Sequence, residues 1–287
     1  MQIARFDGGR IGVVRGQGIV DVTALCGVDP SAWPPVGMNV LIAAFDRLRG
    51  ALAAASGPVI PLASVRLETP IPWPNKVVAF PVNYHDHASE MGANYRATTQ
   101  GFFLKPPSGV SGPADPIVLP ALPGRRIDHE CELGIVIGKQ GRNIARRDWQ
   151  DYIFGYACLM DIVVRGKEER VFRKAFDTFC PVGPWLTTAD EVGDPTGIRL
   201  RLWVNGELRQ DANTRDLVLD IPGMIAQASA VMTLFPGDIL ASGTPAGVGP
   251  IRPGDKVRIE IERVGEMTLD VVQGTGGYDA AFAATPP

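Results

Sequence analysis

The stretch HECELGIVIG (residues 129–138) joins two acidic residues to an uninterrupted apolar run. From Leu133 onward the run is apolar on both faces of an extended chain, which is typical of a strand buried on both sides. Alternate residues of a strand point to opposite faces, so Glu130 and Glu132 point the same way. Two neighbouring carboxylates repel each other, so they need either solvent or a cation between them.

An acidic pair at the solvent-facing end of a strand is the ordinary explanation for this pattern. Burial is favoured here because the strand is apolar and because Asp161 also follows an apolar run, YACLM (156–160). Three buried carboxylates without a partner are very costly, and a divalent cation removes that cost. Oxygen-only ligands favour Mg²⁺, Mn²⁺ or Ca²⁺ over Zn²⁺. The predicted metal ligands are Glu130, Glu132 and Asp161.

A second pair of candidate residues lies in NYHDHASEMG (83–92), which predicts a short helix with Asn83 as its N-cap. His87 and Glu90 are three positions apart and share a helix face. A carboxylate that holds an imidazole makes a general base for activating water. Ordinary polar residues on a surface helix are the alternative. His129 points away from the Glu130 face, so we expect it to be structural.

Three cations adjoin apolar segments: Lys105 in FFLKPP, Arg165 in DIVVRG and Lys174 in FRKAFDTF. Each alone would usually be a surface cation whose stem packs on apolar neighbours. Near a metal, such groups could hold a substrate carboxylate or stabilise an enolate. The glycine-rich loop SGTPAGVGP (242–250) could bind an anionic oxygen through its N–H groups and Thr244, although a plain turn explains it equally well.

The composition is that of an ordinary globular protein that acts on a small molecule. The chain has 287 residues, a net charge of −3 and no dense Lys/Arg cluster, which argues against a nucleic-acid partner. It lacks an apolar run of the roughly 18 residues that a membrane helix requires, and its first residues lack a signal-peptide core. The four cysteines are scattered and form no metal-binding spacing. We therefore expect free thiols and a cytoplasmic location, without a membrane.

Turn signals between short apolar runs indicate a β-rich α+β fold. Residues 1–22 predict three short strands, and helical spacing over 38–56 predicts one helix. Asn205-Gly206 between alternating segments predicts a hairpin. The proline-rich connector 68–76 marks the predicted boundary between a small N-terminal α+β domain, residues 1–70, and a catalytic domain, residues 71–287.

From about residue 70 to 270 the chain resembles the fumarylacetoacetate hydrolase family. The resemblance rests on several motifs in a specific order. In sequence, the matching pieces are NYHDHASEMG, GFFLKPPS, DHECELGIVIG, MDIVVRG, RKAFDTFCPVGPW, LWVNGELRQDANT and PGDILASGTPAGVGP.

The resemblance implies a catalytic domain with a mixed β-roll and flanking helices, and a homodimer. It also implies Mg²⁺ or Mn²⁺ on the three carboxylates, with Ca²⁺ as a further candidate, and a His–Glu pair on a lid helix. Glu168 stands where the family often has glutamine. The residues that the resemblance places in the site are the catalytic His87, Glu90 and Lys174, and the substrate contacts Tyr84, Lys105, Arg165, Glu168 and Thr244.

The resulting hypothesis is a metal-dependent hydrolase of a C–C bond in a small anionic 1,3-dioxo acid such as an acylpyruvate, in the breakdown of aromatic ring-cleavage products. His87, oriented by Glu90, would deprotonate water, and Lys174 would stabilise the departing enolate. The alternative is a decarboxylase, isomerase, tautomerase or hydratase of a 2-oxo acid that uses the same site. A non-catalytic protein that keeps the fold is the third hypothesis.

Overall fold

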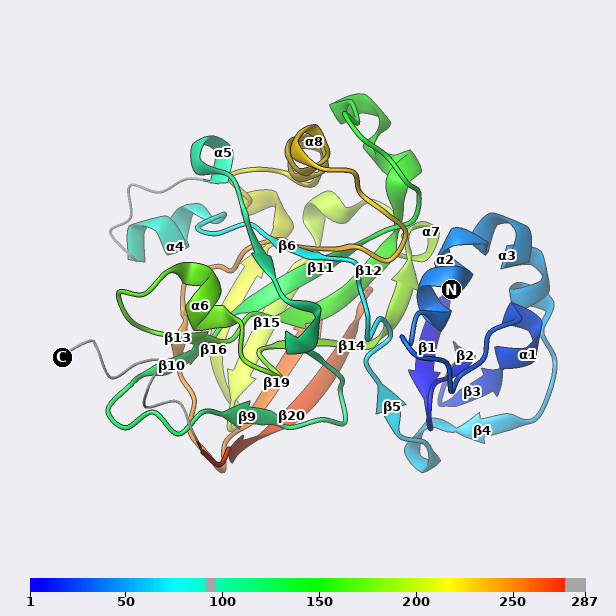
Figure 1. Cartoon of the computed structure of the whole chain (residues 1–287), viewed down its shortest axis with the longest axis horizontal. Coiled ribbons are helices and arrows are strands. Elements are labelled where there is room, and N and C mark those ends of the chain that lie inside the picture. The colour runs from blue at the N-terminus through cyan, green and yellow to red at the C-terminus, as the bar shows by residue number, and fades with distance from the viewer. Residues whose placement is uncertain (91–96, 277–287) are drawn as a thin grey trace.

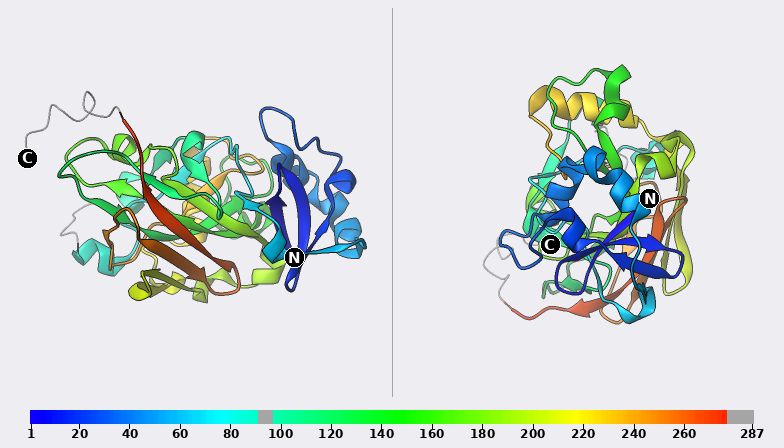
Figure 2. Two further views of the ribbon diagram at one scale, coloured as in Figure 1. Left: turned by 90° about the horizontal axis from the view of Figure 1, so that it is seen from below. Right: turned by 90° about the vertical axis from the view of Figure 1, so that its right-hand side faces the viewer.

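The structure is a computed structural model of the chain, and it describes residues 1–90 and 97–276. An N-terminal part lies at one end of an elongated molecule, beside a larger β-rich body (Figure 1, Figure 2). The strands are β1 (Gln2–Phe6), β2 (Arg10–Arg15), β3 (Gly18–Asp21), β4 (Val59–Pro61), β5 (Leu67–Glu68), β6 (Val77–Ala79), β7 (Phe103–Lys105), β8 (Val110–Ser111), β9 (Ile117–Leu119), β10 (Ile127–His129), β11 (Cys131–Ile137), β12 (Ile153–Met160), β13 (Val163–Val164), β14 (Cys180–Thr188), β15 (Arg199–Val204), β16 (Glu207–Asn213), β17 (Ile239–Ala241), β18 (Gly249–Pro250), β19 (Lys256–Ile261) and β20 (Gly265–Gln273). The helices are α1 (Thr23–Cys26), α2 (Gly37–Ala43), α3 (Phe45–Ala54), α4 (His85–Glu90), α5 (Ala97–Gln100), α6 (Arg170–Lys174), α7 (Ala189–Val192) and α8 (Ile221–Val231).

The largest sheet runs through both parts of the molecule, in the order β4-β3-β2-β1-β14-β12-β11-β17-β6-β7. Strand β1 pairs antiparallel with β14, which joins the N-terminal strands to the body. A second sheet, β16-β15-β19-β20-β9, packs beside it, and β13-β10-β18 forms a third. The predicted division near residue 70 stays a prediction, because strands from both sides of it belong to one sheet.

Strand β11 lies between β12 and β17 and is buried along its whole length. Cys131, Leu133 and Ile135 belong to one apolar core, whereas Val136 belongs to a second core on the opposite face of the sheet. The predicted strand, buried on both sides with alternating faces, is therefore confirmed. This central position carries the start of β11, with its two glutamates, into the interior.

Replacing Leu133 by alanine is expected to lower the free energy of unfolding by about 2–5 kcal/mol, because it leaves a cavity in a closely packed core. Leu208→Ala on β16 is the matched control, since Leu208 is 47% exposed; a surface change of this kind costs roughly 0.5 kcal/mol or less. Urea unfolding followed by circular dichroism measures both variants. Equal costs for the two would contradict the buried position of β11.

The Asn205-Gly206 hairpin is confirmed: it joins β15 to β16, and its two residues have φ of 51° and 81°. The single helix predicted over 38–56 is wrong. It breaks at Ala44, with φ −102° and ψ 5°, into α2 and α3. Each short helix buries its own residues, Leu41 in α2 and Leu52 in α3, in directions that one straight helix would not reach.

The predicted N-cap at Asn83 is also wrong, because α4 begins at His85 and the Asn83 side chain is used elsewhere. Its amide oxygen accepts from the Leu219 N–H at 2.8 Å, and its amide nitrogen donates to the Ser242 carbonyl at 2.8 Å. Asn83 thus ties the start of the α4 segment to two distant loops. In the part of the chain that the structure describes, no helix has both the length and the apolar character to cross a bilayer.

Candidate functional site

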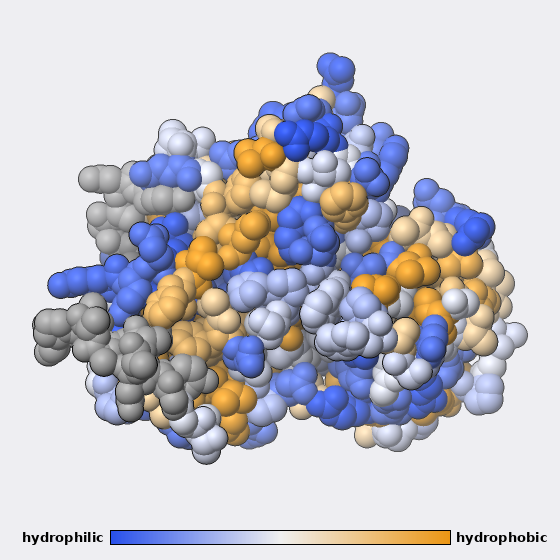
Figure 3. Space-filling model, viewed as in Figure 1, coloured by the Kyte–Doolittle hydropathy of each residue, from blue (hydrophilic) through white to orange (hydrophobic). Residues whose placement is uncertain are grey.

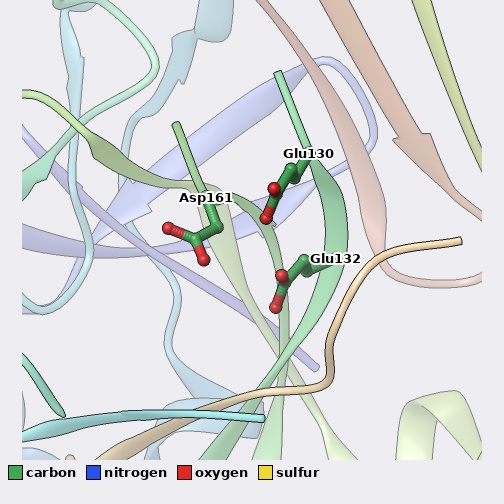
Figure 4. A group of neighbouring side chains, drawn as sticks. All are labelled: Glu130, Glu132 and Asp161. Atoms are coloured by element: carbon green, nitrogen blue, oxygen red, sulfur yellow. The ribbon is translucent and has the colours of Figure 1, made fainter. Parts of the chain in front are cut away.

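Three carboxylates converge where β11 begins and β12 ends. Cys131 pairs with Met160 across these strands, and the Asp161 N–H donates to the Glu130 carbonyl at 3.0 Å. Figure 4 shows Glu130, Glu132 and Asp161 with their carboxylates turned toward one another. One oxygen of each lies within 4.8 Å of the others, and all three residues are buried. The predicted ligand residues are therefore brought together.

Two lysines compensate part of this negative charge. The Lys174 ammonium donates to Glu130 Oε2 at 2.6 Å and also to Asp161. The Lys105 ammonium donates to Asp161 Oδ1 at 2.5 Å. Burial alone would favour the neutral acid, but Lys105 and Lys174 together hold the pKa of the Asp161 carboxyl below its usual value. Asp161 is thus ionised and fixed in position.

Glu132 has a different environment, and it tests whether a metal fits. Its Oε2 accepts from the Gly243 N–H at 2.8 Å, and among the described residues it forms no ion pair. Burial, and then the charge of Asp161, raise the pKa of the Glu132 carboxyl well above its usual value. A buried carboxylate of this kind requires a cation or a proton. With Glu130 and Asp161 it offers the oxygen ligands that Mg²⁺ and Mn²⁺ prefer, so the residues fit a divalent cation.

The predicted general base is assembled on α4. His87 Nδ1 lies 2.9 Å from Glu90 Oε2, and Glu90 Oε1 accepts from the Gly247 N–H at 3.0 Å. Glu90 therefore fixes both the imidazole and the position of α4 on the glycine-rich loop. When Nδ1–H donates to Glu90, the lone pair of His87 Nε2 is available to accept a proton.

These groups surround one cavity of about 360 Å³, a size that suits a small organic acid. Glu90 and Lys105 contact lining residues from outside the cavity. The predicted site residues that line it are His87, Glu130, Glu132, Asp161, Arg165, Lys174 and Thr244.

Two predicted substrate contacts lie elsewhere. Tyr84 is fully buried, and its hydroxyl has no hydrogen-bond partner among the described residues. Glu168 forms a double ion pair with Arg125, at 2.9 and 2.8 Å, and does not line the cavity. The structure does not bring either side chain to the cavity, so their substrate roles stay predictions.

Arg165 lines the cavity but is engaged with acidic residues. Its Nε donates to Asp128 Oδ2 at 2.7 Å, and its guanidinium lies 3.2 Å from Glu130 Oε1. Asp128 is fully buried, so it anchors Arg165 firmly. Arg165 therefore helps to hold Glu130 in place at the mouth of the carboxylate group.

Gln210, on β16, is a positioning residue that the sequence did not reveal. Its amide nitrogen donates to Thr244 Oγ at 2.8 Å, and its amide oxygen accepts from the Cys131 N–H at 3.0 Å. It thus links the start of β11 to the loop that bears Thr244. Because Thr244 Oγ accepts from Gln210, its own hydroxyl hydrogen is available to donate into the cavity. No local pattern marks Gln210, since both contacts cross to distant segments.

Arg170 and Arg173 on α6 also line the cavity, and sequence reasoning missed them. The signal was present in RVFRK (170–174), where cations recur at the first, fourth and fifth positions. This spacing places three cations on one helix face. Only the fold determines that this face is turned inward.

Known proteins resemble this chain over most of its length. A family model described as fumarylacetoacetate (FAA) hydrolase C-terminal matches residues 76–272. Maleylpyruvate hydrolase of Aquipseudomonas alcaligenes is 43% identical over 285 residues, which cover 94% of this chain and 99% of that protein.

Solved structures show the same likeness. The crystal structure of maleylpyruvate hydrolase from Sphingobium sp. SYK-6, in complex with manganese (II) ion and pyruvate, is 63% identical, with a TM-score of 0.90 over 96% of this chain and 100% of that one. That of 5-carboxymethyl-2-hydroxymuconate delta-isomerase from Mycobacterium smegmatis is 33% identical, with a TM-score of 0.76 and the same coverage.

Proposed function

This chain belongs to the fumarylacetoacetate hydrolase family, and we propose that it is a manganese-dependent hydrolase that cleaves maleylpyruvate into maleate and pyruvate. The family and the β-rich α+β fold predicted from the sequence are confirmed, and so is the hydrolase class. The observation that carries the proposal is the single cavity that places the His87–Glu90 pair opposite the three carboxylates.

Maleylpyruvate is a 1,3-dioxo acid, so two carbonyl groups flank the carbon whose bond breaks. Cleavage expels the pyruvate part as an enolate, which is a poor leaving group unless its charge is stabilised. When bound to Glu130, Glu132 and Asp161, a divalent cation supplies a Lewis acid for that charge. The maleylpyruvate hydrolase of Sphingobium, which was solved with manganese and pyruvate, supports this choice of ion and product.

His87 and Glu90 would activate the water. His87 Nε2 removes a proton from a water molecule in the cavity, and the resulting hydroxide adds to the carbonyl carbon of the maleyl part. Glu90, 2.9 Å from Nδ1, stabilises the imidazolium that forms. The C–C bond then breaks with its electron pair on the pyruvate carbon, and the proton held by the imidazolium is returned to the products.

Lys174 would stabilise the negative charge that develops on the departing oxygen. Burial disfavours its ammonium form, but Asp161, Glu130 and Glu132 raise the pKa of Lys174 above its usual value, so it stays charged. The Thr244 hydroxyl would donate to the carboxylate of the pyruvate part, since its oxygen already accepts from Gln210. These donors are in place before substrate binds, which lowers the cost of stabilising the new charge.

The alternative, an isomerase, tautomerase, hydratase or decarboxylase, is favoured by the 33% identity to an isomerase. Incubation with maleylpyruvate, oxaloacetate and a 2-oxo-enedioate in the presence of Mn²⁺ separates these reactions by their products. We expect equal amounts of maleate and pyruvate from the first acid, measured by nuclear magnetic resonance. Isomer formation or release of carbon dioxide, with maleylpyruvate left uncleaved, would overturn the hydrolase proposal.

Three finer expectations accompany the proposal. Mg²⁺ as the ion used by this protein, a homodimeric assembly and a cytoplasmic location all stay predictions. A role in the breakdown of aromatic ring-cleavage products is supported by the likeness to maleylpyruvate hydrolases and to the muconate isomerase.

A further inference from the structure

Helix α6 places its side chains in the reverse of the usual order. Arg170, Arg173 and Lys174 share one face and line the cavity, whereas Val171 and Phe172 are each 45% exposed. Figure 3 shows apolar and strongly polar residues side by side over the region that α6 occupies in Figure 1. A helix of this kind normally buries its apolar residues and exposes its charges. Turning the cations inward is favourable when an anion binds there.

The two arginines are held without loss of their charge. Arg173 Nε donates to the Glu168 carbonyl at 2.8 Å, and its Nη1 donates to the Val164 carbonyl at 3.2 Å. Both acceptors are neutral, so they orient the guanidinium but do not cancel its charge. The Arg170 guanidinium lies 5.6 Å from the centre of the Phe103 ring, which forms another wall of the cavity.

The charges around the cavity do not balance without a ligand. Four cationic side chains line it, from Arg165 and from α6, against the three carboxylates. Arg165 and Lys174 already pair with Glu130. A divalent cation adds two further positive charges on the same side of the balance. A substrate with one carboxylate and one enolate leaves an excess on α6, and a second carboxylate would neutralise it.

We propose that Arg170 and Arg173 form a subsite for a second carboxylate, at the end of the substrate remote from its pyruvate part. The enzyme then selects dicarboxylic acylpyruvates over monocarboxylic ones. A guanidinium is well suited to this task, because its planar N–H groups can bind both oxygens of a carboxylate. This inference rests on the proposed hydrolase function, which supplies the pyruvate half of the substrate.

The test compares maleylpyruvate with acetylpyruvate, which lacks the second carboxylate. For Arg170→Met, the ratio of kcat/KM for maleylpyruvate to that for acetylpyruvate is expected to fall roughly 10- to 100-fold, the effect of losing a charge-assisted hydrogen bond. Arg170→Lys keeps the charge and is expected to restore part of the ratio. Arg147→Met is the control, since the Arg147 side chain is 87% exposed and does not line the cavity.

An unchanged ratio, or equal losses on both acids, would overturn the subsite even if the hydrolase function holds. If the wild-type protein cleaves neither acid, the hydrolase function itself fails, and calorimetry with maleate in the presence of Mn²⁺ then tests the subsite alone. Weaker maleate binding by Arg170→Met than by Arg147→Met would support the subsite. Equal binding by the two variants would reject it.

Discussion

Replacing Glu132 by alanine is expected to abolish manganese binding and to reduce turnover roughly 10³-fold or more, because stabilisation of the enolate by the metal is worth several kcal/mol. Glu132 is the most informative of the three carboxylates to remove. Glu130 and Asp161 pair with Lys174, so their removal would leave a buried ammonium without its partner. Glu132 forms no ion pair among the described residues, so its loss affects chiefly the cation. Calorimetric titration of the metal-free protein with Mn²⁺ measures the binding.

Glu207→Ala is the matched control for this experiment. The Glu207 side chain is 67% exposed on β16, and it does not line the cavity. This variant is expected to bind one Mn²⁺ per chain and to turn over as the wild type does. Manganese uptake by Glu132→Ala with the affinity of the wild type would show that the metal binds elsewhere.

His87→Ala is expected to keep manganese binding but to lose turnover by roughly 10²- to 10⁴-fold, the usual contribution of a general base. The imidazole forms its hydrogen bond with Glu90 and makes none to the three carboxylates. Its removal therefore takes away the proton acceptor and leaves the metal ligands in place. Steady-state kinetics with maleylpyruvate, together with the calorimetric titration, separate the two effects.

His85→Ala tests whether any change on α4 has the same effect. His85 lies on the same short helix but is exposed to solvent. We expect this variant to retain the turnover of the wild type. Turnover by His87→Ala close to that of His85→Ala would rule out His87 as the base.

Local geometry made much of the site predictable from sequence. Alternation along a strand assigned Glu130 and Glu132 to one face, and the structure has that arrangement. Helical spacing put His87 beside Glu90, and they lie 2.9 Å apart. Both patterns act over at most three residues, so they hold almost regardless of the surrounding fold. Asp161 needed more, because its place depends on the pairing of β11 with β12.

Contacts between distant segments could not be predicted in the same way. Glu168 pairs with Arg125, 43 positions away, which keeps its carboxylate out of the cavity. Gln210 reaches both Thr244 and the start of β11, although nothing in its neighbourhood indicates this. The inward face of α6 is a property of the whole cavity wall. In each case the partner is chosen by tertiary packing, which sequence spacing does not encode.

The most direct test of the metal-dependent cleavage starts from metal-free protein mixed with maleylpyruvate. Nuclear magnetic resonance follows the substrate and its products before and after one equivalent of Mn²⁺ is added. We predict no cleavage before the addition and, after it, maleate and pyruvate in equal amounts. Equal cleavage with and without Mn²⁺, or loss of maleylpyruvate without formation of pyruvate, would contradict a metal-dependent C–C hydrolase.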